Sequence, residues 1–108
     1  MEFDRYQQLA RATKIYPEKY NIIYPTLKLA GEAGEVAEKV GKVLRDNNGE
    51  FSDEKIFEIA KELGDLCWYI ANLASDLGLS LDTIAEQNIQ KLIDRKVRNT
   101  LHGSGDNR

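Results

Sequence analysis

Cysteine, histidine and proline are nearly absent from this chain, and each scarcity excludes a class of protein. The single cysteine, Cys67, cannot form an internal disulfide, and with the single histidine, His102, it cannot complete a structural zinc site. The same counts exclude a Cys–His protease and a ferritin-like metal centre, which needs Glu-x-x-His pairs from two helices. Two prolines in 108 residues also argue against disorder by composition.

Long apolar runs are missing as well. No stretch approaches the ~18 consecutive apolar residues of a membrane-spanning helix. The start, MEFDRYQQ, is too acidic and polar for a signal peptide. We therefore expect a cytoplasmic protein with no membrane partner. The length leaves room for one domain, which we place at residues 1–98, followed by a polar tail at residues 99–108.

Charge is unevenly distributed along the chain. Residues 46–86 carry ten acidic and two basic side chains, whereas residues 88–108 carry five basic and two acidic ones. An acidic centre repels the phosphates of a nucleic acid, so we expect no nucleic acid partner. The same centre attracts divalent cations, while the basic end is either solvated or placed to meet phosphates.

Apolar residues at helical spacing predict an all-α fold. The residue before Pro17 avoids the helical region and ends the first helix, and the Asn-Asn-Gly turn at residues 47–49 ends the second. Ser52 and Ser80 are suited to cap the N-termini of the third and fourth helices, and Gly78 ends the third helix. The expected helices are residues 3–14, 24–45, 53–77 and 81–97.

The two central helices are long for so short a chain. The remaining segments cannot cover both on every side, so apolar surface is left for a partner. The third helix carries a broad apolar stripe, and we expect packing to enclose it. We therefore predict a four-helix bundle-type subunit with two long antiparallel central helices, assembled into a homo-oligomer, either a dimer or a tetramer.

Acidic residues are paired on both central helices. Glu32 and Glu35 are three residues apart and project from one side of the second helix, and Glu62 and Asp65 do the same on the third. Taken alone, each pair can be a solvated acidic surface, and Glu35 with Lys39 has the spacing of a surface ion pair. The two pairs together indicate a functional site more strongly than either pair alone.

The position of the pairs along the helices predicts that they meet. Both lie roughly 20 Å from the connecting turn at 1.5 Å rise per residue, so antiparallel helices bring them to the same level. Four converging carboxylates repel one another unless a cation compensates. Oxygen-only ligands select a hard cation, so we expect Mg²⁺, with Mn²⁺ as a substitute.

Two glycines lie beside the first acidic pair. Gly31 and Gly34 each cost roughly 1 kcal/mol in a helix interior relative to alanine. Their presence predicts close approach of another backbone or of a ligand.

Polar, basic and aromatic residues could complete a nucleotide site. Basic side chains beside acidic groups complement a polyphosphate, although basic residues near a helix end also favour its dipole. Tyrosines and the tryptophan can stack on a base or pack in the core. The candidates are Lys39, Tyr69, Asn72, Asn88, Lys91 and Arg95 for substrate, and Tyr16, Tyr20, Tyr24 and Trp68 for stacking.

These residues resemble the MazG-like nucleoside triphosphate pyrophosphohydrolases of the all-α NTP pyrophosphatase group. The family pattern Glu-x-x-Glu followed by Glu-x-x-Asp reads here Glu32-Ala33-Gly34-Glu35 and Glu62-Leu63-Gly64-Asp65. The flanking segments LAGEAGEVAEKV and KELGDLCWYIANLA extend the resemblance beyond the four acids. The spacing Asn88-x-x-Lys91-x-x-x-Arg95 is similar to the phosphate-side helix of the family, and RNTLHGSGDNR to the ending of its small, single-domain members.

The resemblance implies hydrolysis of a nucleoside triphosphate, ribo or deoxyribo, to monophosphate and pyrophosphate, in the cleansing of nucleotide pools. Carried over, Glu32, Glu35, Glu62 and Asp65 bind Mg²⁺, and either Glu32 or Glu35 activates the attacking water. Tyr69 matches a position that contacts the nucleotide in some relatives. Members are homodimers or homotetramers whose sites are commonly completed by a neighbouring subunit.

Two other hypotheses remain open from the sequence. One is a non-catalytic helical module on the same fold that senses nucleotides or binds a partner. The other is a structural helical bundle whose carboxylates are surface charges, and this one predicts no Mg²⁺-dependent change in stability.

Overall fold

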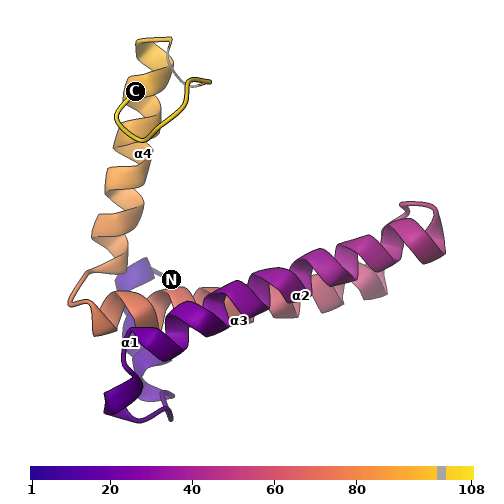
Figure 1. The fold of residues 1–108 in the computed structure, drawn as a ribbon, viewed down its shortest axis with the longest axis horizontal. Coiled ribbons are helices and arrows are strands. Elements are labelled where there is room, and N and C mark those ends of the chain that lie inside the picture. Colours follow the sequence, from indigo (N-terminus) through magenta and orange to yellow (C-terminus); the bar gives the residue numbers. More distant parts are fainter. Residues whose placement is uncertain (100–101) are drawn as a thin grey trace.

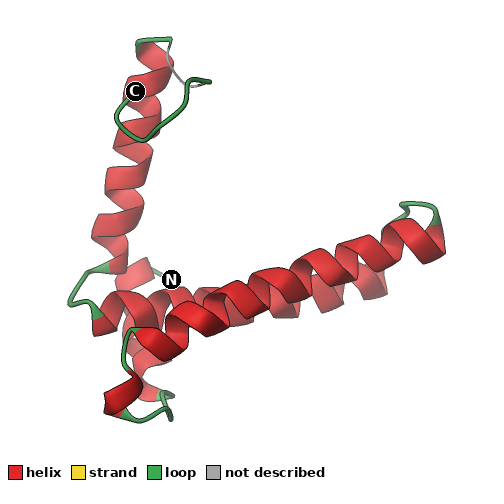
Figure 2. Cartoon of the chain, viewed as in Figure 1, coloured by secondary structure: helices red, strands yellow, loops and turns green. Residues whose placement is uncertain are grey.

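The computed structural model describes residues 1–99 and 102–108, and within them it contains helices and no strand. The predicted all-α class is confirmed, and every predicted helix begins and ends within two residues of the observed one. A short 3-10 turn was not predicted. The elements are α1 (Phe3–Ala12), η1 (Glu18–Tyr20), α2 (Ile23–Asn47), α3 (Asp53–Asp76) and α4 (Leu81–Val97), drawn in Figures 1 and 2.

Local signals explain the helix ends. The hydroxyls of Ser52 and Ser80 each accept a hydrogen bond from the backbone amide three residues further on, both at 3.2 Å, which confirms the two predicted N-caps. Asn48 and Gly78 have φ angles of 54° and 73°, in the left-handed region that ends a helix.

The long helices α2 and α3 form an antiparallel hairpin and make the most extensive contact in the chain. In Figure 1 they run side by side as one arm. This confirms the predicted pairing and places the middle of α2 against the middle of α3, at the level of the acidic residues.

The small core lies where α1 meets α3 and the start of α4. Ala10, Ala71 and Leu81 form it, with Tyr6 and Trp68 packed against them. The buried side chain of Gln7 ties these helices together: its amide donates to the Leu79 carbonyl and its oxygen accepts from the Leu81 amide, both at 2.9 Å.

The four helices do not close into a bundle within one chain, contrary to the predicted subunit shape. The helix α4 contacts α1 near the junction and then projects away from the α2–α3 arm (Figure 1). The sequence predicted the helices correctly, but the direction of α4 depends on the Gly78 turn and the contacts of α1.

Packing within the chain does not enclose α3, so that expectation is wrong for the single subunit. Ile56, Phe57 and Leu63 are 53%, 62% and 47% exposed. The reason is that α2 covers one side of α3 and α1 covers only its C-terminal half. None of the helices in the described ranges is both long and apolar enough to cross a membrane.

Candidate functional site

Three of the four predicted acidic residues come together between α2 and α3. Glu32, Glu62 and Asp65 each offer a carboxylate oxygen within 4.8 Å of the others. Glu35 is exposed and lies one turn further along α2, outside this group. The helical rise therefore predicted correctly that the acids of α2 and α3 lie at the same level. The rotation of α2 about its axis, however, brings Glu32 and not Glu35 to the α3 acids. We call Glu32, Glu62 and Asp65 the carboxylate cluster.

Like charges lie close together in the carboxylate cluster and raise the pKa of one member. Burial raises the pKa of Glu32, and its hydrogen bond with Glu62 and the nearby charge of Asp65 raise it further, while Lys28 opposes them. Lys39 lies at the edge of the cluster, with its Nζ 3.8 Å from Glu62 Oε1. The donor set consists of oxygens only, which fits a hard divalent cation.

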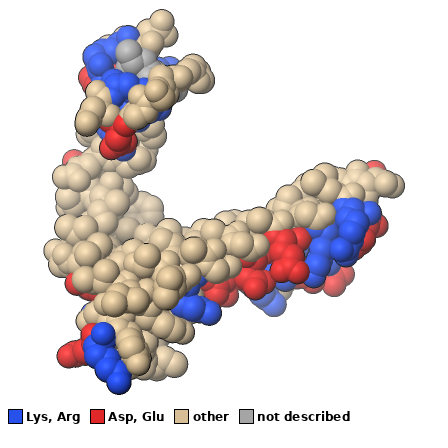
Figure 3. Space-filling model, in the orientation of Figure 1, with Lys and Arg blue, Asp and Glu red and all other residues tan. Residues whose placement is uncertain are grey.

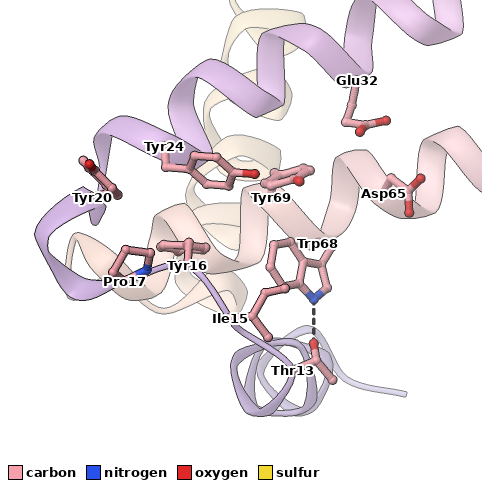
Figure 4. Close-up of a pocket in the computed structure, with 10 residues that line it drawn as sticks. All are labelled: Thr13, Ile15, Tyr16, Pro17, Tyr20, Tyr24, Glu32, Asp65, Trp68 and Tyr69. Carbon is pink, nitrogen blue, oxygen red and sulfur yellow. Dashed lines mark hydrogen bonds between the residues drawn. The ribbon is translucent and has the colours of Figure 1, made fainter.

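A hollow of about 730 Å³ opens beside the cluster and is walled by aromatic rings (Figure 4). Glu32 and Asp65 lie on one side of it, and the rings come from α3, from the segment before α2 and from the first turn of α2. The site therefore combines carboxylates with flat apolar surfaces. The lining residues are Thr13, Ile15, Tyr16, Pro17, Tyr20, Tyr24, Glu32, Asp65, Trp68 and Tyr69.

Four of the rings form a closed circuit. Tyr16 lies 5.3 Å from Tyr24 and 6.3 Å from Trp68, and Tyr69 lies 6.3 Å from Tyr24 and 5.0 Å from Trp68, between ring centroids. The indole of Trp68 donates to the Thr13 hydroxyl at 2.7 Å, drawn as a dashed line in Figure 4. The circuit holds each ring at a fixed angle to its neighbours.

Tyr69 connects the aromatic wall with the carboxylates. Burial raises the pKa of its hydroxyl, and the neighbouring Tyr24 hydroxyl and the charges of Glu32 and Asp65 raise it further. The phenol therefore stays protonated at neutral pH and is a hydrogen-bond donor at the border between the two halves of the site.

With this geometry in place, comparison with known proteins identifies the family. The MazG nucleotide pyrophosphohydrolase domain matches residues 25–98, from the start of α2 to the end of α4. The chain belongs to the MazG family. It is also 44% identical over 114 aligned residues to the Gene 37 protein of Mycobacterium phage L5, with both chains covered completely. No solved structure gives a significant match.

Membership of the MazG family agrees with the resemblance seen in the acidic motifs, and the name of the phage relative adds no activity. The MazG match includes the carboxylate cluster, Tyr69 and Trp68. It begins after Tyr16, Tyr20 and Tyr24, so three of the five aromatic rings that line the hollow come from a segment that the family match does not cover.

Asn72 has a different place from the one that its spacing indicated. It is completely buried, and its side chain contacts α1: the amide donates to the Ala10 carbonyl at 3.5 Å, and the oxygen accepts from Arg11 at 3.3 Å. It does not line the hollow. Its polar atoms hold α1 against α3, and a helical wheel cannot reveal this because the wheel omits α1.

The predicted basic residues of α4 are not brought to the carboxylate cluster within one chain, because α4 projects away from the hairpin (Figure 1). Lys91 Nζ and Arg95 Nη2 donate to Asp106 Oδ1 of the tail at 2.8 and 3.1 Å, and Arg95 also donates to the Asp106 carbonyl. Asn88 is exposed. Within the chain the three residues face the tail or solvent.

The glycines beside the acids have open space around them. A Cβ placed on Gly31 or Gly34 meets no atom of the chain within 4 Å. The predicted close approach of another backbone is therefore not made within the described chain.

Sequence reasoning missed Thr13, Ile15 and Pro17, which line the hollow between the tyrosines. The available signal was the segment Tyr16-Pro17 to Tyr24-Pro25, which holds three tyrosines and two prolines in ten residues.

Proposed function

We propose that this chain is a Mg²⁺-dependent nucleoside triphosphate pyrophosphohydrolase, which converts its substrate to the monophosphate and pyrophosphate. The observation that carries the proposal is the carboxylate cluster opening onto an aromatic hollow, with Glu32 and Asp65 lining both. The family membership supports a pyrophosphohydrolase. We further propose that the enzyme is cytoplasmic, clears surplus or non-canonical nucleotides, and binds neither nucleic acid nor membrane.

Each half of the site has its own part. The aromatic wall binds the base by stacking, and Tyr69 donates a hydrogen bond at the border. Glu32, Glu62 and Asp65 hold Mg²⁺, with Mn²⁺ as a substitute and Glu35 as a further ligand one turn away. Bound there, a divalent ion neutralises phosphate charge and makes a coordinated water more acidic.

The reaction adds one water across the anhydride between the α- and β-phosphates. Either Glu32 or Glu35 orients the attacking water and accepts its proton. Lys39, next to Glu62, is placed to approach the charged phosphates. Residues 1–98 form the functional unit because the segment before α2 supplies half of the hollow.

A second copy of the chain completes the site in this proposal, as a homodimer or homotetramer. Asn88, Lys91 and Arg95 lie on an arm that does not reach the cluster of its own chain. Supplied by a neighbouring subunit, they contact the β- and γ-phosphates, and Asp106 gives up its bonds to Lys91 and Arg95.

The test is product analysis with the purified full chain. Each common NTP and dNTP is incubated with Mg²⁺, and pyrophosphate is separated from phosphate. We expect pyrophosphate plus monophosphate, with turnover lost in Glu35→Gln. The matched control is Glu38→Gln, one turn further along α2, where the exposed glutamate pairs with Lys42.

The other outcomes are equally informative. Phosphate plus diphosphate would show that the scissile bond is wrong. Mg²⁺-dependent stabilisation without turnover of any nucleotide would favour the sensing module, and the absence of both would favour the structural bundle.

A further inference from the structure

A buried carboxylate lies behind the aromatic wall and belongs to no part of the chemistry above. The side chain of Asp76, at the end of α3, has no exposed surface. Its Oδ1 accepts from Arg11 Nη1 at 2.5 Å, and its Oδ2 accepts from the Tyr16 hydroxyl at 2.9 Å and from the Ile22 amide at 2.8 Å. One side chain thus binds α1, the connecting segment and the start of α2.

The Ile22 amide belongs to a strained turn. Ile22 has φ 71° and ψ −55°, and the Ile23 amide donates to the Asn21 carbonyl at 2.8 Å. These are the features of a γ-turn of the rare form, which a β-branched residue seldom adopts. Such backbone persists only where the surroundings hold it, and here Asp76 provides a partner for the amide.

This arrangement fixes the part of the wall that α3 does not carry. Tyr16 takes part both in the Asp76 hydrogen bonds and in the ring circuit, and Tyr20 and Tyr24 lie on either side of the Ile22 turn. The carboxylates on the opposite side of the hollow come from helices that already pack against each other (Figure 4). Asp76 therefore contacts the aromatic half of the site and not the half that carries the carboxylates.

We propose that Asp76 is a positioning residue for base recognition, which holds the Tyr16–Tyr24 wall in its binding shape through Arg11, Tyr16 and the Ile22 turn. The inference rests on the proposed function for the identity of the ligand. Asp76 does not line the hollow, so a base bound there would not contact it. Its contribution is to order the wall before binding, so that less conformational entropy is lost when the base enters.

The electrostatics agree with a charged Asp76. Burial raises the pKa of this carboxyl, but the Ile22 amide, Arg11 and Tyr16 together hold it below its usual value. Burial and the Asp76 hydrogen bond raise the pKa of Tyr16 to about 12, so its hydroxyl remains a donor throughout the physiological range.

Two variants and a control test the proposal. Tyr16→Phe keeps the ring in the wall and removes its hydroxyl, which donates to Asp76 at 2.9 Å and accepts from Arg11 at 3.4 Å. Asp76→Asn removes the charge with little change in size. Asp46→Asn is the control, because its exposed carboxylate pairs with the adjacent Arg45 at the far end of the hairpin. We expect a KM about tenfold higher in the two variants, kcat within about threefold of wild type, and no change in the control.

The split between KM and kcat separates positioning from simple loss of structure. A variant that is partly unfolded has fewer active molecules, which lowers kcat and leaves KM unchanged. That pattern, or an unchanged KM in both variants, overturns the proposal. Tyr16→Phe decides alone if circular dichroism shows that Asp76→Asn does not fold.

A binding measurement keeps this test independent of the reaction. Trp68 is the only tryptophan and lies in the wall, so its fluorescence reports titration with AMP, GMP, CMP, UMP and dTMP. We expect about tenfold weaker affinity in both variants for the monophosphate that binds wild type best. A wild type that binds a monophosphate but hydrolyses no triphosphate sinks the proposed function alone, whereas equal affinities in wild type and variants sink the role of Asp76 alone.

Discussion

At the scale of single residues, the main feature of the site is a set of like charges held close together. Glu32, Glu62 and Asp65 share one small volume, and the raised pKa of Glu32 is the direct result of its burial and of those neighbours. A group whose pKa is raised by folding favours the folded state at low pH and disfavours it once it ionises. The cluster is therefore a place where the folded chain stores unfavourable electrostatic energy, which the proposed Mg²⁺ would relieve.

Replacing Glu32 by glutamine tests this balance. Without metal, we expect the contribution of Glu32 to stability to be lost as pH rises above about 4.5, the ordinary pKa of glutamate. Glu32→Gln should therefore melt at a higher temperature than wild type at neutral pH. With Mg²⁺ at about 100 times its Kd, wild type should gain about 2.7 kcal/mol and Glu32→Gln far less. Thermal melts in EDTA and in Mg²⁺ measure both effects.

Glu35→Gln and Glu38→Gln complete this series. Because Glu35 lies outside the cluster, its glutamine variant should lose less of the Mg²⁺-dependent shift than Glu32→Gln, and Glu38→Gln should lose none. Equal losses in the Glu32 and Glu35 variants would show that Glu35 rotates fully into the site when metal binds.

At the scale of helices, a capping side chain fixes where a helix begins and can also bind that helix to a neighbouring one. Ser52 caps α3, whereas the Ser80 hydroxyl caps α4 and also donates to the Asp4 carboxylate of α1 at 2.8 Å. Asp4 in turn accepts from the Asp82 amide at 3.0 Å. The start of α4 is therefore held to α1 by polar contacts around one cap.

The two serines give a matched comparison of these roles. Ser52→Ala should cost about 1 kcal/mol, the usual loss for an N-cap. Ser80→Ala should cost more, because Asp4 loses its hydroxyl donor together with the cap. Urea unfolding at one fixed protein concentration, followed by circular dichroism, measures both, and equal costs would mean that the bond to Asp4 contributes nothing to stability.

At the scale of the whole molecule, one chain does not cover its own apolar surface. The radius of gyration is 16.8 Å, compared with about 13 Å for a compact domain of this length. Along α4, Ile89, Ile93 and Val97 are 53%, 52% and 80% exposed. Figure 3 shows a long stretch of α4 without charged side chains, while charges crowd the α2–α3 arm. This surface is what supports the proposed homo-oligomer.

An acidic substitution on α4 tests the assembly. We expect Ile93→Asp to convert the oligomer to a 12.3 kDa monomer, because an interface cannot bury an unpaired carboxylate without a cost of several kcal/mol. Gln87→Asp adds the same charge on another side of α4 and should leave the mass unchanged. Light scattering coupled to size exclusion gives the masses, and a monomeric wild type would contradict the proposal.

The sequence alone determined the helices and the level at which the acids meet. These signals are local: the caps Ser52 and Ser80, the turn at Asn48 and the apolar spacing. They act through residues close in sequence, so they do not depend on the tertiary structure. The fixed rise per residue of a helix then predicted that Glu32 and Asp65 lie at the same level of the hairpin. For the same reason the acidic motif pointed to the correct family.

Tertiary structure decided everything that joins residues far apart in the chain. Asp76 looks like an ordinary helix-end acid until folding brings it to Ile22, 54 residues away, and Asn72 shares a wheel sector with the acids until α1 covers it. The direction of α4 and the exclusion of Glu35 from the cluster likewise follow from how helices rotate and pack. Local patterns set which elements form, but only the packed chain sets which side chains meet, because packing depends on the shapes of all the neighbours at once.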